Sequence, residues 1–134
     1  MRSLLTGLLV LLALAGCAKP PYTGVDNTEL KTLLAQGVPI YDVRRPDEWQ
    51  QTGVVQGSHK LTFVDASSRL NPAFFPAFTQ QVARDQPVII ICRSGSRSSK
   101  LARELMEKHG YTKVYNVSNG MNGWQAEANP VVRS

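Results

Sequence analysis

The chain has few of the residues that bind metals or cross-link proteins. Its 134 residues include only two cysteines and two histidines, and these four lie far apart in the sequence. Protein metal sites are built mainly from clusters of cysteine, histidine and carboxylate side chains, so the sequence predicts no metal site. Two cysteines allow at most one disulfide, which excludes a fold held together by several disulfides.

Long apolar runs and concentrated charge are also scarce. No apolar run reaches the ~20 residues that a membrane-spanning helix needs. Lysine and arginine number 15 against 10 aspartates and glutamates, a net charge of +5, and the basic residues are scattered along the chain. They do not alternate with aromatic residues as on a nucleic-acid-binding surface, so we expect no nucleic-acid partner. The mild positive excess instead suits small anionic substrates and an anionic membrane surface.

The start of the chain has the features of a secretory signal. Met1-Arg2 is a short basic start, and residues 4–15 form an apolar run that is too short to span a bilayer. Leu-Ala-Gly-Cys follows at residues 14–17 and resembles the lipobox of bacterial lipoproteins. The resemblance implies cleavage before Cys17 and lipidation of Cys17. The alternative is an ordinary signal peptide with an incidental cysteine.

We therefore expect three parts: a lipoprotein signal peptide at 1–16, a lipidated N-terminus and tether at 17–24, and a folded domain at 25–134. Lipidation predicts a protein of the bacterial cell envelope that is anchored by lipid and faces the periplasm. Ala18, rather than aspartate, follows the lipidated cysteine, and by resemblance to the sorting rules of diderm bacteria this implies the outer membrane. With lipid on Cys17, Cys92 is the only free thiol of the mature chain.

The most informative segment surrounds Cys92. An apolar run at residues 88–91, typical of a buried strand, leads into Cys92, and a helix is expected at residues 99–109. Backbone N–H groups and the macrodipole at a helix start favour an anion, so Cys92 is predicted to be a nucleophilic thiolate. An inert core cysteine is the alternative. The candidate substrate-binding residues are those that follow: Arg93, Ser94, Gly95, Ser96, Arg97 and Ser98.

Strands alternate with helices along the rest of the domain. Asp26 and Glu29 have the spacing of a capping box at a helix start, and Gly37 is expected to end that helix. Further strands are predicted at residues 38–43, before the strand at 88–91 in the chain, and at residues 114–117, after it. This alternation predicts a parallel sheet with helices on both faces, and sites in such sheets lie at the carboxyl ends of the strands.

Other polar residues near the predicted strand ends are weaker candidates. Asp42 and Arg44 are expected to pair and brace the end of the sheet, with a substrate-binding role for Arg44 as the alternative. His59 is expected to be a surface turn residue, with a role as a base near the loop as the alternative. The neighbouring carboxylates Asp47 and Glu48 are expected to lie in a solvated turn, with a catalytic dyad as the alternative.

Three segments in this order resemble the rhodanese (sulfurtransferase) family. The first is Tyr-Asp-Val-Arg at 41–44 with Pro-Asp-Glu-Trp at 46–49, similar to the family's D-V-R-x-P-x-E-[WY]. The second is the cysteine loop, which has four residues between Cys92 and Arg97, one fewer than the similar loop of tyrosine phosphatases. The third, residues 114–124, resembles the family's G-G-x-x-G-W segment, with Asn119 in place of the first glycine. Asparagine tolerates a positive φ angle, so we expect this turn to survive.

The resemblance covers roughly residues 25–131 and implies both a fold and a function. The fold is α/β, the rhodanese-like three-layer arrangement with a central parallel sheet and helices on both faces. The function is that of a thiosulfate sulfurtransferase, which moves sulfane sulfur from thiosulfate or a related donor through a persulfide on Cys92, with no metal or organic cofactor. The partners are then a small anionic sulfur donor, an acceptor that is cyanide or a thiol, such as that of a thioredoxin-like protein, and the membrane.

Two other function classes stay open on this scaffold. One is a non-catalytic rhodanese-like module that binds an anion or a partner protein, and the presence of Cys92 argues against it. The other is a phosphatase or arsenate reductase, and the short loop argues against it because its cradle suits a terminal sulfur better than a tetrahedral phosphate.

Overall fold

The computed structural model describes residues 19–134. The predicted signal peptide and Cys17 therefore lie outside the described residues. No helix among the described residues is long and apolar enough to cross a membrane. The elements are β1 (Thr23–Val25), α1 (Asn27–Ala35), β2 (Ile40–Asp42), α2 (Pro46–Thr52), β3 (His59–Lys60), α3 (Phe74–Gln81), β4 (Val88–Ile91), α4 (Ser96–Lys108), β5 (Val114–Val117) and α5 (Gly120–Ala126).

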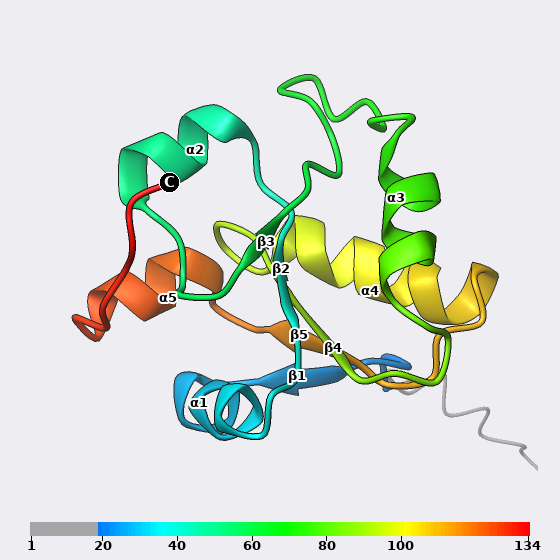
Figure 1. Cartoon of the computed structure of the whole chain (residues 1–134), viewed down its shortest axis with the longest axis horizontal. Coiled ribbons are helices and arrows are strands. Elements are labelled where there is room, and N and C mark those ends of the chain that lie inside the picture. The colour runs from blue at the N-terminus through cyan, green and yellow to red at the C-terminus, as the bar shows by residue number, and fades with distance from the viewer. Residues whose placement is uncertain (1–18) are drawn as a thin grey trace, which may run out of the picture.

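The strands form one parallel sheet in the order β1-β5-β4-β2-β3. The central strand β4 is the apolar run Val88–Ile91, and all four of its residues are buried. A parallel sheet is covered on both faces, which is why its central strand is apolar throughout rather than alternating. The twisted sheet and the helices that flank it are visible in Figure 1. The predicted α/β fold with a central parallel sheet is confirmed.

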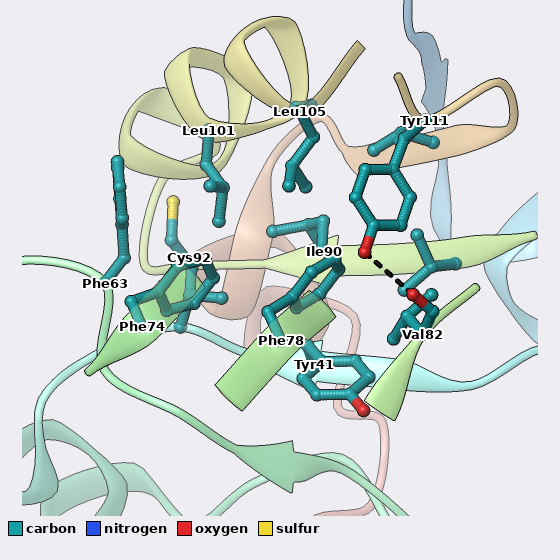
Figure 2. Packing of buried hydrophobic residues seen from close by; sticks show 14 of the residues in the cluster. Tyr41, Phe63, Phe74, Phe78, Val82, Ile90, Cys92, Leu101, Leu105 and Tyr111 are labelled. Atoms are coloured by element: carbon teal, nitrogen blue, oxygen red, sulfur yellow. Dashed lines mark hydrogen bonds between the residues drawn. The ribbon is translucent and has the colours of Figure 1, made fainter. Parts of the chain in front are cut away.

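Each face of the sheet has its own apolar core. Ile90 and Cys92 belong to the larger core, together with residues of α3 and α4, and this core is drawn in Figure 2. Ile89 and Ile91 belong to the second core, with residues of α1 and α5. Successive side chains of a strand point to opposite faces, so one strand supplies both cores. Cys92 is thus delivered to the α3–α4 side of the sheet.

The helix ends follow the sequence signals, with one correction. The Asp26 side chain accepts from the Glu29 N–H at 2.8 Å and the Glu29 side chain accepts from the Asp26 N–H at 3.2 Å, which confirms the predicted capping box. Helix α4 begins at Ser96, three residues before the predicted start. Gly95 has φ +95° and turns the chain sharply into the helix, so the loop is shorter than expected.

The edge of the sheet also differs from the prediction. Strand β2 is limited to Ile40–Asp42 of the predicted 38–43. His59 is exposed as predicted, but it lies in β3 rather than in a turn, and its ring stacks on that of Tyr41 with centroids 4.8 Å apart. β3 is an edge strand that pairs with β2 over two residues only, which is too short to give an alternating pattern in the sequence.

Candidate active site

Cys92 lies directly after β4, and its side chain is fully buried. Its Sγ accepts hydrogen bonds from the N–H of Gly95 at 3.2 Å and the N–H of Ser98 at 3.4 Å. The hydroxyl of Ser98 lies 3.2 Å from the same sulfur. These donors sit at the start of α4, where the unpaired N–H groups of the helix carry partial positive charge. The arrangement therefore places three hydrogen-bond donors around the sulfur of Cys92.

Asn116, in the middle of β5, connects Ser98 to the loop. The Asn116 Oδ1 lies 2.5 Å from the Ser98 hydroxyl oxygen, and the Asn116 Nδ2 donates to the Gly95 carbonyl at 3.4 Å. A serine hydroxyl has one proton, so Ser98 can donate to Asn116 or to the Cys92 sulfur but not fully to both. Asn116 therefore competes with the sulfur for the proton of Ser98.

Two glycines allow the loop to pack against the segment between β5 and α5. A Cβ on Gly95 would lie 2.2 Å from the carbonyl oxygen of Ser118, and one on Gly120 would lie 2.5 Å from that of Cys92. Gly120 also has φ +54°. Asn119, in contrast, has φ −107°. The predicted turn is present, but Gly120 rather than Asn119 takes the positive φ angle.

The start of α5 orients the carbonyl groups of the loop. The N–H of Met121 donates to the carbonyl of Cys92 at 2.9 Å, and the N–H of Asn122 donates to that of Arg93 at the same distance. These carbonyls therefore bond to α5, while the N–H groups of Gly95 and Ser98 bond to the sulfur.

Arg97, in the first turn of α4, forms an ion pair with Glu48 of α2. Its two terminal nitrogens lie 2.6 and 2.7 Å from the two carboxylate oxygens of Glu48. Burial would raise the pKa of Glu48, but hydrogen bonds from Arg97 and Arg45 and the charges of both guanidinium groups bring it below its usual value. The hydrogen bonds to Glu48 raise the pKa of Arg97 in turn. The expectation of a solvated turn is wrong for Glu48, which is only 5% exposed.

Asp42 and Arg44 pair at the carboxyl end of β2, beside the end of β4 that leads into Cys92. The Nη2 of Arg44 lies 2.8 Å from a carboxylate oxygen of Asp42, and both side chains are fully buried. Arg44 also donates to Thr52 and to the carbonyl of Gly53, while the indole N–H of Trp49 donates to Asp42 at 3.0 Å. The predicted pairing is confirmed, and the guanidinium of Arg44 is engaged by protein groups.

The remaining loop residues form an exposed rim. Arg93, Ser94 and Ser96 are exposed, whereas Gly95 and Ser98 are buried. Arg93 borders a cleft of about 140 Å³ between α2 and α5. Within residues 19–134, no three His, Cys, Asp or Glu side chains lie close enough to hold a metal ion together.

The family model of the rhodanese-like domain matches residues 26–127. The chain belongs to the rhodanese-like domain family. A thiosulfate sulfurtransferase of Tolumonas auensis is 31% identical to this rhodanese-like domain over 105 residues, which cover 78% of this chain and 89% of the relative. Thiosulfate sulfurtransferase 18 of Arabidopsis thaliana is 30% identical over 112 residues, covering 80% of this chain and 81% of that protein.

A solved structure agrees with the fold. The polysulfide-sulfur transferase homodimer of Wolinella succinogenes superimposes with a TM-score of 0.67 at 20% identity, covering 85% of this chain and 80% of that chain. This likeness concerns the fold alone.

The structure brings most of the predicted rhodanese loop together and adds two residues to it. Gly95 and Ser98 contact the Cys92 sulfur and are buried, whereas Arg93, Ser94 and Ser96 lie on the exposed rim. The additions are Glu48 and Asn116. A polar residue within the apolar strand 114–117 was the available signal for Asn116, because a buried amide must find hydrogen-bond partners.

Proposed function

We propose that this rhodanese-like domain is a lipid-anchored sulfurtransferase that moves sulfane sulfur from thiosulfate or a related donor to a thiol or cyanide. The observation that carries the proposal is the environment of the Cys92 Sγ. It lies at the end of the central strand and within hydrogen-bond distance of two backbone N–H groups and one hydroxyl. Donors at a helix start that converge on one atom form a site for an anion, and the anionic form of a cysteine is its nucleophilic form.

The proposed reaction has two covalent steps. The Cys92 thiolate attacks the outer sulfur of thiosulfate, the bond between the two donor sulfurs breaks, and sulfite leaves with that electron pair. Cys92 then carries a persulfide with one negative charge. In the second step cyanide or a thiolate attacks the outer sulfur, thiocyanate or a new persulfide leaves, and the Cys92 thiolate is restored. This is a ping-pong sequence that needs no further reactant.

The contacts of the loop divide the roles of its residues. Gly95 and Ser98 would hold the sulfur of Cys92 and of its persulfide. Arg93 is exposed beside the cysteine and would attract the dianionic donor. Arg97 is engaged in its ion pair with Glu48, so it would hold the loop in shape rather than bind the donor. Ser94 and Ser96 lie on the rim, where their hydroxyls would donate to the donor's oxygens.

Two further lines support the proposal. Two relatives named thiosulfate sulfurtransferases align with 78% and 80% of this chain. The lipobox-like residues 14–17 support an anchor at Cys17 on the periplasmic side of the envelope, at the outer membrane. The acceptor would then be a periplasmic thiol, such as that of a thioredoxin-like protein, or cyanide.

Intact-mass measurement of the purified chain tests the chemistry. Thiosulfate should add the mass of one sulfur atom, and cyanide should remove it and release thiocyanate. The Cys92→Ser variant is the matched control and should do neither. If no sulfane donor gives an adduct, the non-catalytic binding module is the better description. Turnover of an aryl phosphate without a sulfur adduct would instead favour a phosphatase.

A further inference from the structure

We infer that the end of the domain opposite Cys92 is a basic surface that rests on an anionic lipid bilayer, so that the active site faces away from the membrane. The inference rests on the lipid anchor proposed for Cys17. It adds an orientation and a contact surface, which lipidation alone does not give.

The first step is the direction of the strands. All five strands are parallel, and Cys92 follows the carboxyl end of β4. The chain enters the sheet at Thr23, the amino end of β1. In a parallel sheet all amino ends lie at one edge and all carboxyl ends at the other. The entry point and the active site therefore lie at opposite ends of the sheet, an arrangement that Figure 1 allows the reader to follow.

The second step is the short reach of the tether. Tyr22 is partly buried and packs against the larger core, so it fixes the position where the chain leaves the domain. Four residues, 18–21, separate Tyr22 from Cys17. The five steps from the Cα of Cys17 to the Cα of Tyr22 span at most about 18 Å when fully extended. A domain of this size is about 35 Å across. The tether is therefore too short for the domain to turn over and bring Cys92 to the lipid.

The third step is the charge of the end that faces the anchor. Four exposed basic residues lie there, namely Lys19, Arg84, Lys108 and Lys113. Lys108 ends α4 and, with Tyr22, borders a surface hollow of about 330 Å³. Arg84 lies beside the turn after α4, where its guanidinium sits 5.0 Å from the ring of Tyr111.

The same end carries fewer acidic than basic side chains. Glu104 of α4, which is partly buried, borders the same hollow as Lys108. Lys113 follows Thr112, whose N–H donates to the carbonyl of Arg84, so these basic residues are neighbours. Asp85, which follows Arg84 in the turn before β4, is an exposed acidic residue. Glu107, the acid next to Lys108 on α4, is paired with Arg103 at 3.0 Å. Anionic headgroups attract basic residues held near the membrane surface, and the anchor holds these residues there.

The orientation has a consequence for the acceptor. A loop that faces away from the bilayer is open to molecules of the aqueous compartment and closed to groups embedded in the lipid. The sulfur acceptor is therefore a water-soluble thiol or anion that reaches Cys92 from the far side of the domain.

The test uses the full lipidated chain, purified in detergent and reconstituted into vesicles of either phosphatidylcholine alone or phosphatidylcholine with phosphatidylglycerol. Flotation of the vesicles first reports whether the chain is anchored. Brief amine labelling, read by peptide mass spectrometry, then measures the accessibility of Lys108 and Lys113. Lys60 is the internal reference, because β3 pairs with the carboxyl end of β2 and so lies at the active-site end. Alkylation of Cys92 reports the access to the site.

We expect labelling of Lys108 and Lys113 to fall several-fold on the anionic vesicles and to recover at high salt, while Lys60 labelling and Cys92 alkylation stay at their values in detergent. Lys19 is labelled in the same experiment and should show the same salt-dependent protection. The Lys108→Glu/Lys113→Glu variant should still float but lose this protection of Lys19. The Lys60→Glu/Arg69→Glu variant makes the same change of charge at the active-site end, where exposed Arg69 follows β3, and it should keep that protection.

Each contrary outcome has a separate meaning. Failure of the wild-type chain to float overturns the anchor and the orientation together. Flotation without protection of Lys108 and Lys113 on anionic vesicles overturns the docking surface but leaves the anchor and the sulfurtransferase standing. Protection of Lys60 and slower alkylation of Cys92 would show the inverted orientation.

Discussion

Arg97 of the active-site helix and Glu48 of α2 form a two-pronged ion pair, with nitrogen–oxygen distances of 2.6 and 2.7 Å. The pair joins the start of α4 to a helix that precedes it by about 50 residues in the chain, and Glu48 is nearly inaccessible to solvent. A planar guanidinium matched to a carboxylate fixes both side chains in orientation as well as in distance. The position of the cysteine loop thus depends on α2.

Arg97→Ala should slow sulfur transfer from every donor, because it loosens the loop and leaves the Glu48 carboxylate buried without its main partner. Loss of one member of a buried pair costs about 3–5 kcal/mol, and the partial exposure of Arg97 reduces this to roughly 1–3 kcal/mol here. Kinetics with one charged and one neutral sulfur donor, together with a urea unfolding midpoint, measure both effects. An effect confined to the charged donor would show that Arg97 binds the donor instead.

Arg93→Ala should weaken the use of thiosulfate with little effect on a neutral donor. Arg93 is exposed, so its attraction for a dianion is screened over about 10 Å at 0.1 M salt. The difference between wild type and variant should therefore shrink as salt is added, and the unfolding midpoint should stay unchanged. KM for thiosulfate measured at low and high salt checks this. Equal losses with both donors would reverse the roles given to the two arginines.

The features predicted from the sequence are those encoded locally. The capping box of Asp26 and Glu29 spans four residues, and the apolar run 88–91 identifies a buried strand through composition alone. The strand, the cysteine and the helix that follows are contiguous, so the chemistry of Cys92 could be inferred before any tertiary contact was known. The start of α4 was missed by three residues, because the turn at Gly95 depends on its close contact with Ser118.

The features that the sequence did not reveal depend on distant partners. The sequence Pro46-Asp47-Glu48 is typical of a polar turn. The partner of Glu48 is Arg97, which is 49 residues away in the chain, so the local pattern does not indicate the ion pair. Asn116 lies 18 residues from Ser98. The hydrogen-bond partner of a buried polar side chain is decided by which elements pack together, and a local pattern does not identify that partner.

Acid should destabilise the domain partly through Glu48. Its folded-state pKa lies below the ordinary value of 4.5, so the carboxylate contributes stability above that value and loses it as pH falls through the folded-state pKa. The wild type should therefore lose more free energy of unfolding between about pH 7 and pH 3 than Glu48→Gln does, although the variant is less stable at neutral pH. Urea titrations of both proteins at several pH values measure this difference. Parallel pH profiles would contradict the role of Glu48.

Cys17→Ser should release the protein from the membrane fraction, because the apolar run 4–15 is too short to hold it there. One acyl chain gives only marginal binding, so stable anchoring implies more than one chain on Cys17. Fractionation after a carbonate wash, with Cys92→Ser as the control that keeps its anchor, checks this. A Cys17→Ser protein that still sediments with membranes would show that the anchor lies elsewhere.

Ser98→Ala and Asn116→Ala should change the reactivity of Cys92 in opposite directions. The first variant removes a hydroxyl that donates to the sulfur, and a hydrogen bond to a charged group contributes about 1.5–3 kcal/mol, so alkylation near neutral pH should slow by roughly tenfold or more. The second variant removes the competing acceptor, which leaves the proton of Ser98 free for the thiolate, so alkylation should become faster at low pH. Both variants leave buried groups without partners, so both should lower the unfolding midpoint. A merely structural role for Asn116 predicts slower alkylation in both variants, and the rate of iodoacetamide labelling against pH separates the two cases.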